Sequence, residues 1–210
     1  MPNYLEALTT NLTLSGELGR DVRAFLVHHG CPNTAAHCAA VAAEAGRQAT
    51  RFGEDVIRAE SAGLLHDVSA IFPPAQRAKI AHRLGLEVLP EEEIFPMIIH
   101  QKLSVVLAQA VFGMTDTGVL SAAGCHTTLK AGASRLDKVV FVADKIAWDQ
   151  PGRPPYLDDL LAGLENSLDG GVFVYLDYLW QQRASLRVVH PWLAEAYREM
   201  KEMVQNRLTR

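Results

Sequence analysis

Apolar residues recur along this chain mostly at intervals of three and four positions, and no segment of strand length alternates strictly between apolar and polar residues. This spacing puts the apolar side chains of each segment on one face of a helix. The sequence therefore predicts an all-α fold. The expected helices span about 15–29, 34–52, 55–67, 74–84, 91–112 with a break near Pro96 or His100, 117–126, 134–149, 156–168, 172–188 and 191–208.

Residues typical of helix ends mark the first two of these helices. Gly30 and Gly53 each follow the last apolar position, where a glycine accommodates the left-handed backbone that commonly closes a helix. Side-chain oxygens of Ser, Asn and Thr satisfy free amides at a helix start. We therefore expect Ser15 to cap the first helix, and Asn33 or Thr34 to cap the second.

The third expected helix ends in a His-Asp pair. The Pro-Pro sequence at 73–74 cannot continue a helix, which places His66 and Asp67 in its last turn. The preceding segment, Ala62-Gly63-Leu64-Leu65, is apolar and contains small residues that let neighbouring helices approach closely. The pair is thus expected to be partly buried, and a partly buried carboxylate needs a cation.

The clearest loop is the segment 149–156, which contains three prolines and one glycine. We expect one domain over 1–210, in which this loop separates a ligand-bearing bundle at 20–150 from C-terminal helices at 151–210. No internal repeat or low-complexity tract contradicts this organisation.

Composition limits the function classes. A chain of 210 residues, 49% of them hydrophobic, can bury one sizeable core. Lys and Arg total 20 against 24 Asp and Glu, for a formal net charge of −4, and no basic run stands out. Nucleic acid is therefore not an expected partner. A membrane is not expected either, because no apolar stretch approaches the roughly 20 residues of a spanning helix.

The N-terminal segment and the cysteine spacing both favour a cytoplasmic location. The first residues, MPNYLEALTTNLTL, lack the positively charged start and apolar core of a secretory signal, so we expect a soluble, cytoplasmic protein. Cys31, Cys38 and Cys125 show no Cys-x-x-Cys spacing, which argues against disulfides and a thiolate metal site. They are expected to be small buried residues.

Asp144 lies on an apolar helical face. The residues three or four positions away are Val140, Phe141, Ala147 and Trp148. A buried carboxylate on such a face should meet a metal ion, a basic side chain or a proton. A salt bridge to a core Arg or His is the alternative to a metal.

Three further histidines occupy apolar helical segments, and each alone is more typical of a hydrogen-bonded core residue than of a ligand. Together with the residues above they give an ordered set: His37, His66, Asp67, His100, His126 and Asp144. Imidazole and carboxylate ligands suit Fe, Mn or Zn better than Mg or Ca. The remaining histidines are expected at the surface or at helix boundaries: His28, His29, His82 and His190. A helical scaffold with core histidines and no metal is the competing interpretation.

The ordered set resembles the HD-domain phosphohydrolase superfamily, and within it the YqeK-like branch of symmetrical diadenosine tetraphosphate hydrolases. The resemblance covers about residues 20–150. It rests on His37 near the start of a helix, on Gly63-Leu64-Leu65-His66-Asp67, on Ile99-His100, on His126-Thr127-Thr128 and on the segment from Leu136 to Asp144.

The resemblance implies an HD-domain helical bundle with a C-terminal helical extension. It also implies that His37, His66, Asp67 and Asp144 bind a metal ion, iron in the first place and Mn, Zn, Ni or Co as alternatives. His100 and His126 would face the substrate phosphate or help to hold a second ion.

Two basic positions of the resembling family are missing. Family members usually carry a lysine shortly after the His-Asp pair and a basic residue before the first histidine, where this chain has Ala70 and Thr34. Since phosphate recognition generally needs Lys or Arg, Lys145 or Arg153 could replace the lost charge.

The resulting functional prediction is a metal-dependent phosphohydrolase acting on a nucleotide. Asp67 would orient the attacking water and accept its proton. His100 and His126 would stabilise phosphoryl charge or protonate the leaving group. Thr127 and Arg153 would add substrate contacts. The preferred substrate is a dinucleoside tetraphosphate, cleaved to two nucleoside diphosphates.

Two other functions stay open at this point. One is an HD-type nucleoside monophosphate phosphatase, and the other is a non-catalytic nucleotide-binding module. The apolar segment 172–180 would either complete the core or form a homodimer face, and an internal role is the commoner outcome.

Overall fold

The computed structural model describes residues 2–208, which form helices and connecting loops with no strand in that range. The all-α prediction is thus confirmed. The α-helices are α1 (Pro2–Glu6), α2 (Leu18–His28), α3 (Pro32–Phe52), α4 (Val56–Leu65), α5 (Arg77–Arg83), α6 (Pro90–Ile94), α7 (His100–Ala110), α8 (Thr117–Cys125), α9 (Arg135–Ile146), α10 (Leu157–Asn166), α11 (Leu168–Gln181) and α12 (Pro191–Leu208). Short 3₁₀ helices are η1 (Ala7–Thr9), η2 (Val68–Ile71), η3 (Pro74–Gln76) and η4 (Pro96–Ile99).

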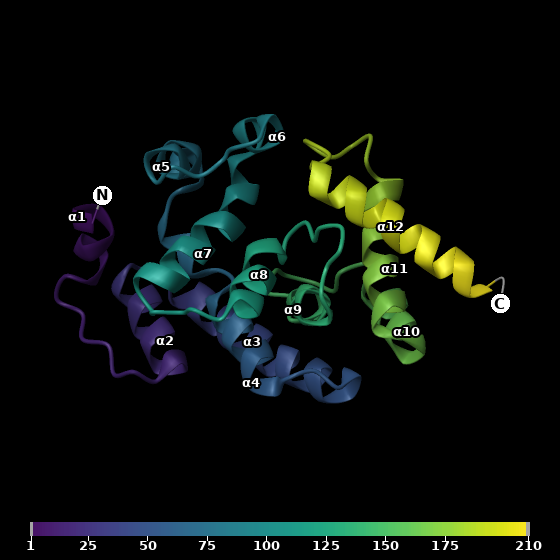
Figure 1. Cartoon of the computed structure of the whole chain (residues 1–210), viewed down its shortest axis with the longest axis horizontal. Helices are drawn as coiled ribbons and strands as arrows, with labels where there is room; N and C mark the ends of the chain where they lie inside the picture. Colours follow the sequence, from purple (N-terminus) through teal and green to yellow (C-terminus); the bar gives the residue numbers. More distant parts are fainter. Residues whose placement is uncertain (1, 209–210) are drawn as a thin grey trace.

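The centre of the fold is a bundle built on α3, α4, α8 and α9. Helix α3 packs against both α4 and α9, while α8 packs against α7 and α9. Figure 1 shows α1 and α2 at one side of this bundle and α10 to α12 at the other. Among the described helices, none is both long enough and apolar enough to cross a membrane.

Helix α9 is buried along most of its length, because neighbouring helices cover more than one of its faces. Every residue from 136 to 143 is buried. A reciprocal cap starts the helix: the Asp137 amide donates to Ser134 Oγ at 3.1 Å, and the Ser134 amide donates to Asp137 Oδ2 at 2.8 Å. The cap determines where α9 begins, and so which turn carries Asp144.

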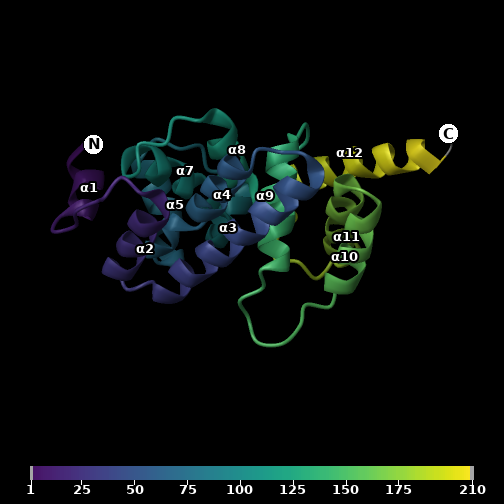
Figure 2. The same ribbon diagram turned by 90° about the horizontal axis from the view of Figure 1, so that it is seen from below.

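The C-terminal helices stack with α11 between α10 and α12, and α11 also contacts α9. The Trp180 ring lies parallel to that of Tyr197, with the ring centroids 4.6 Å apart. The loop after α9 swings out before the chain returns to α10 (Figure 2). The proposed division near residue 150 falls in this loop and stays a prediction, as does a homodimer.

Several predicted helix ends are correct and several caps are wrong. Gly30 and Gly53 have left-handed backbones, with φ of 77° and 68°, as expected. The cap of α2 is Glu17, which accepts from the amides of residues 19 and 20. Ser15 instead donates to the Asp21 carboxylate. Helix α3 starts at Pro32, one residue before the predicted caps, and Cys31 provides no side-chain cap.

Other differences concern the two ends of the chain. Helix α1 was not predicted. Helix α11 begins at Leu168 and ends at Gln181 rather than spanning 172–188, because Ser167 accepts from the Gly170 amide and caps it. His190 immediately precedes α12, which is one of the helix-boundary positions expected for it, but it is not at the surface: its side chain is 1% exposed, and its Nε2 lies 3.3 Å from Glu92 Oε1. Cys38 and Cys125 are buried as predicted, whereas Cys31 is only partly buried.

Candidate metal centre

Six predicted side chains lie together at one point of the bundle, and the first and last of them are 107 residues apart in the sequence. His37 lies in the second turn of α3, and Asp144 lies near the end of α9. The other four stand at element boundaries: His66 follows α4, Asp67 precedes η2, His100 opens α7 and His126 follows α8.

The first group combines His37, His66, Asp67 and Asp144. His37 Nε2 lies 3.2 Å from Asp144 Oδ1 and 3.3 Å from His66 Nε2. His66 Nε2 lies 3.6 Å from Asp144 Oδ1 and 3.6 Å from Asp67 Oδ2. One ligand atom each from His37, His66 and Asp67 falls within a mutual 4.8 Å, which is close enough for one ion.

The second group shares Asp67 with the first. Asp67 Oδ1 lies 3.2 Å from His100 Nε2 and 3.6 Å from His126 Nε2. One ligand atom each from Asp67, His100 and His126 also falls within a mutual 4.8 Å. The Asp67 carboxylate therefore lies between two sets of imidazoles and turns a different oxygen to each.

The same local hydrogen bond orients three of these imidazoles. Nδ1 of His66 and of His126 contact the carbonyl oxygens three residues earlier, Gly63 at 2.7 Å and Ala123 at 2.8 Å. The last carbonyls of a helix lack intrahelical partners, so a histidine just after the helix can donate to one. His100 contacts the Met97 carbonyl in the same way.

The same hydrogen bonds test whether a metal fits. A carbonyl oxygen only accepts, so Nδ1 of each ring carries the proton and Nε2 of a neutral ring presents a lone pair. His100 Nε2 and His126 Nε2 nevertheless face each other at 2.9 Å. Two lone pairs at that distance repel unless a cation interacts with them. Backbone-oriented imidazoles beside carboxylates are typical of metal ligands, so the cluster could hold a metal ion.

The electrostatics of the cluster favour positive charge near the carboxylates. Burial alone would raise the pKa of Asp67, but His66, His100 and His126 outweigh it and hold that pKa below its ordinary value. Burial lowers the pKa of His66, yet nearby Asp67 raises it well above the ordinary value. Burial lowers the pKa of both His100 and His126.

Lys145 adds a cation that the sequence analysis could only suggest. Its side chain is 9% exposed, and Nζ lies 2.5 Å from Asp144 Oδ2. Nζ also donates to the His126 carbonyl oxygen at 3.0 Å. The rings of Phe141 and Tyr175 flank it at 5.1 Å and 5.4 Å. Burial would raise the pKa of Asp144, but Lys145 and the hydrogen-bonding histidines bring it well below its usual range.

The cleft itself measures about 290 Å³ and includes aromatic residues that sequence reasoning missed. Tyr156 and Tyr175 line it together with five of the six cluster residues. Tyr156 stands just before α10, and its hydroxyl donates to the Lys145 carbonyl oxygen at 3.3 Å. No local pattern singles out these tyrosines, because only the packing of α11 on α9 brings the C-terminal helices to the cleft.

The structure separates the two predicted substrate contacts. Thr127 lines the cleft, and its hydroxyl lies 3.0 Å from His100 Nε2 and 3.1 Å from His126 Nε2. Arg153 does not line it. Its side chain is 64% exposed and pairs with Asp158, so the prediction that Arg153 binds substrate is corrected.

The cleft continues at both ends. Thr127 and Tyr175 also line a smaller apolar cavity of about 180 Å³, which Phe95 and Arg187 border. At the other end, His37 opens into a slot of about 640 Å³ beside the start of α3. The cleft at the His/Asp cluster thus shares lining residues with two further cavities.

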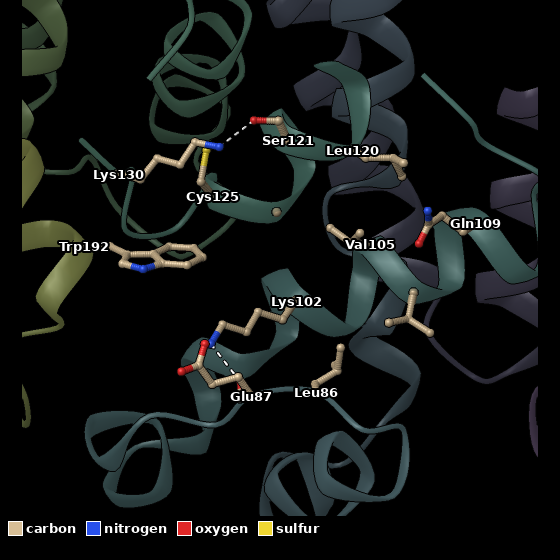
Figure 3. A pocket seen from close by; sticks show the side chains of 12 residues that line it. Leu86, Glu87, Lys102, Val105, Gln109, Leu120, Ser121, Cys125, Lys130 and Trp192 are labelled. Carbon is tan, nitrogen blue, oxygen red and sulfur yellow. Dashed lines mark hydrogen bonds between the residues drawn. The ribbon is translucent and has the colours of Figure 1, made fainter. Parts of the chain in front are cut away.

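A separate apolar recess of about 420 Å³ lies between α7, α8 and Trp192 (Figure 3). Its two lysines are already engaged: Lys102 Nζ lies 2.7 Å from Glu92 Oε2, and Lys130 Nζ donates to Ser121 Oγ at 2.7 Å. None of the six cluster residues lines this recess, so it is separate from the candidate metal centre.

Comparisons with known proteins identify the family of the chain. The HD domain family matches residues 34–149, a span that contains all six cluster residues. A protein of Lactococcus lactis subsp. cremoris, named "Uncharacterized protein in pepC 5'region", is 43% identical over 143 residues, which cover 68% of this chain and 72% of that protein. A symmetrical bis(5'-nucleosyl)-tetraphosphatase of Bacillus subtilis (strain 168) is 32% identical, over 58% of this chain and 63% of that enzyme.

A solved structure is also similar. It is the crystal structure of a predicted HD superfamily hydrolase involved in NAD metabolism from Clostridium acetobutylicum, with a TM-score of 0.78 and 26% identity, covering 87% of this chain and 96% of that one. The fold and the cluster define a helical-bundle hydrolase with a His/Asp centre. The chain belongs to the HD domain family.

Proposed function

We propose that this hydrolase cleaves a phosphoanhydride of a nucleotide with the help of a metal ion, and that its substrate is a dinucleoside tetraphosphate cut into two nucleoside diphosphates. The observation that carries the proposal is the shared position of Asp67 between two groups of imidazoles. The name of the Bacillus subtilis relative supports this choice of substrate.

In this proposal His37, His66, Asp67 and Asp144 hold the ion, and His100 and His126 are available to a second one or to phosphate. A bound ion would lower the pKa of water and withdraw charge from phosphorus. The ion is expected to be iron or another transition metal that accepts nitrogen and oxygen ligands.

Side chains of the cleft would position the water and the substrate. Asp67 is ionised at neutral pH, so its free lone pairs can orient an attacking water and accept its proton. Thr127 can donate its hydroxyl proton to a phosphoryl oxygen. Lys145 places a positive charge beside Asp144, at the wall of the cleft. Tyr156 and Tyr175 cover one side of the cleft and limit water around the substrate.

A nucleoside monophosphate phosphatase is the second candidate, and one observation favours it. Lys145 is the single Lys or Arg among the residues that line the cleft, and its Nζ lies 2.5 Å from Asp144. A tetraphosphate carries more negative charge than one lysine neutralises, although bound metal ions would add charge.

Product analysis separates the candidates. Protein purified without oxygen, with its metal content measured, is incubated with diadenosine tetraphosphate and with AMP, and the products are resolved by anion-exchange chromatography. ADP as the sole product of the first reaction supports the tetraphosphatase. Release of inorganic phosphate from AMP, with diadenosine tetraphosphate left intact, supports the phosphatase. Metal-loaded protein that binds nucleotide but leaves both substrates intact would make it a binding module.

A further inference from the structure

The slot beside the cleft has the features of a binding site for a flat, partly polar ring. It is lined by residues from the start of α3 and from the segment after α9: Asn33, Ala36, His37, Ala40, Ile146, Ala147, Trp148, Asp149 and Gln150. The side chain of Trp148 is 41% exposed, although tryptophan side chains are on average highly buried. Its indole ring is therefore accessible to a ligand.

The other residues that line the slot provide an apolar surface and hydrogen-bonding groups that suit an aromatic ring. Ala36 and Ala40 are one turn apart on α3, so they present a shallow apolar surface with no long side chain. Asn33 and Gln150 add side-chain amides, which both donate and accept hydrogen bonds. Asn and Gln amides match the hydrogen-bonding edge of adenine, and stacking on an aromatic ring suits any base.

The slot is continuous with the metal centre. His37, Trp148, Asp149 and Gln150 line both the slot and the cleft. His37 Nε2 faces Asp144 at 3.2 Å, while its Nδ1 lies 3.9 Å from Asp149 Oδ2 on the adjoining loop. A ligand whose phosphates lie at the cluster can therefore extend a base past His37 into the slot.

We infer that the slot is the nucleobase subsite of this enzyme and that Trp148 stacks on a purine base of the substrate. This inference rests on the proposed nucleotide substrate and adds what recognises its base. Trp148 is a substrate-binding residue in this inference, because it touches the base and not the reacting phosphoryl group.

The test measures binding, not turnover. ADP, the expected product, is titrated into wild-type protein and into Trp148→Leu by calorimetry, alongside inorganic pyrophosphate and ribose 5-phosphate, which have no base. We expect Trp148→Leu to weaken ADP binding by about 5- to 100-fold, the range for loss of one stacked base. Pyrophosphate and ribose 5-phosphate should bind as before. ADP should also quench a part of the wild-type tryptophan fluorescence that Trp148→Leu lacks.

Two further variants make the result specific. Trp148→Phe keeps a ring and should retain most of the ADP affinity. Trp192→Leu alters a tryptophan in the separate recess and should leave ADP binding unchanged. Equal weakening of ADP and pyrophosphate in Trp148→Leu, or no change for ADP, would overturn the inference.

The outcome is independent of the hydrolysis assay. If diadenosine tetraphosphate is not cleaved but ADP affinity depends on Trp148, the proposed activity is wrong and the subsite stands. If diadenosine tetraphosphate is cleaved with the same KM by wild type and Trp148→Leu, the activity stands and the subsite is wrong.

Discussion

At the scale of single residues, Asp67 is the member of the cluster with the most demanding position. Its Oδ2 faces His66 at 3.6 Å, while its Oδ1 faces His100 at 3.2 Å. The adjacency of His66 and Asp67 in sequence makes this possible, because the chain leaves the helical path at this point. Asp67 has φ of −119° and stands between α4 and η2.

Replacing Asp67 by Asn keeps the shape of the side chain and removes its charge and basicity. We expect kcat to fall by about 10²- to 10⁴-fold, the usual effect of losing a general base. The rate of nucleotide hydrolysis measures this, with circular dichroism as a check of the fold. Asp159→Asn, an exposed residue of α10, is the matched control and should keep wild-type activity. An active Asp67→Asn enzyme would remove Asp67 from the mechanism.

Lys145 and Arg153 were both candidates for the missing phosphate-binding charge, with Arg153 as the predicted substrate contact, and the structure places only Lys145 at the cleft. Lys145→Met should raise KM for nucleotide by about 10- to 100-fold, as expected for loss of a hydrogen bond to a charged group. Arg153→Met should leave KM unchanged, because Arg153 pairs with Asp158 outside the cleft. Steady-state kinetics with metal content measured for each variant tests both, and the reverse order would contradict the assignment.

At the scale of elements, the site depends on where helices end and how closely they pack. His66 and His126 each follow the last residue of a helix, so a shift of α4 or α8 by one residue would turn the imidazole away. A close contact holds α4 in register: a Cβ on Gly63 would lie 2.7 Å from the Ala42 Cα of α3. Only glycine allows this approach.

Gly63→Ala should therefore destabilise the protein by about 1–3 kcal/mol, the usual cost of overpacking. Urea unfolding measures the change. Gly19→Ala is the control, because a Cβ there would meet only side-chain atoms of Glu17 and Leu64, at 3.2 Å and 3.7 Å. A glycine to alanine change in a helix is neutral or slightly stabilising when the neighbouring side chains can move aside by a few tenths of an ångström, as the flexible Glu17 side chain can. Equal effects of the two substitutions would contradict the packing argument.

The start of α8 gives a pH-dependent prediction. Hydrogen bonds from Arg58, then from the amides of Val119 and Gly118, lower the pKa of Asp116 to about 2. A carboxyl with a lowered pKa stabilises the fold above its unfolded pKa of about 4, and loses this effect as pH falls toward 2. Asp116→Ala should lower Tm by about 2–6 °C at pH 7. The Tm difference from wild type should shrink between pH 4 and pH 2, as thermal melts at several pH values will show.

At the scale of the whole molecule, the cluster joins α3, α4, α7, α8 and α9 at one point, and the C-terminal helices close one side of the cleft with Tyr156 and Tyr175. A ligand bound there would connect segments from residue 37 to residue 144. Metal binding should therefore stabilise the bundle as a unit.

Removal of metal with a chelator should lower Tm by about 5–10 °C. A ligand at a hundred times its Kd raises the free energy of unfolding by about 2.7 kcal/mol, and a protein of this size gains a few degrees of Tm per kcal/mol. Differential scanning calorimetry measures the shift, and restored metal should reverse it. His37→Ala should show little shift, since it lacks one predicted ligand. The exposed His82→Ala should respond like wild type. A Tm that does not depend on metal in wild type would contradict a metal centre in this cluster.

The sequence alone determined the all-α class, most helix positions and the six residues of the cluster, because helical periodicity and polar residues on apolar faces are local patterns. Caps were harder to predict: Glu17 and Ser167 compete with neighbouring residues of similar chemistry, and only the final hydrogen bonds distinguish them. Tertiary structure decided the rest. It placed Lys145 in the cleft and Arg153 outside it, buried His190 beside Glu92, and brought Tyr156, Tyr175 and the Trp148 slot to the cluster. These contacts join segments that are far apart in the sequence, so local residue spacing cannot predict them.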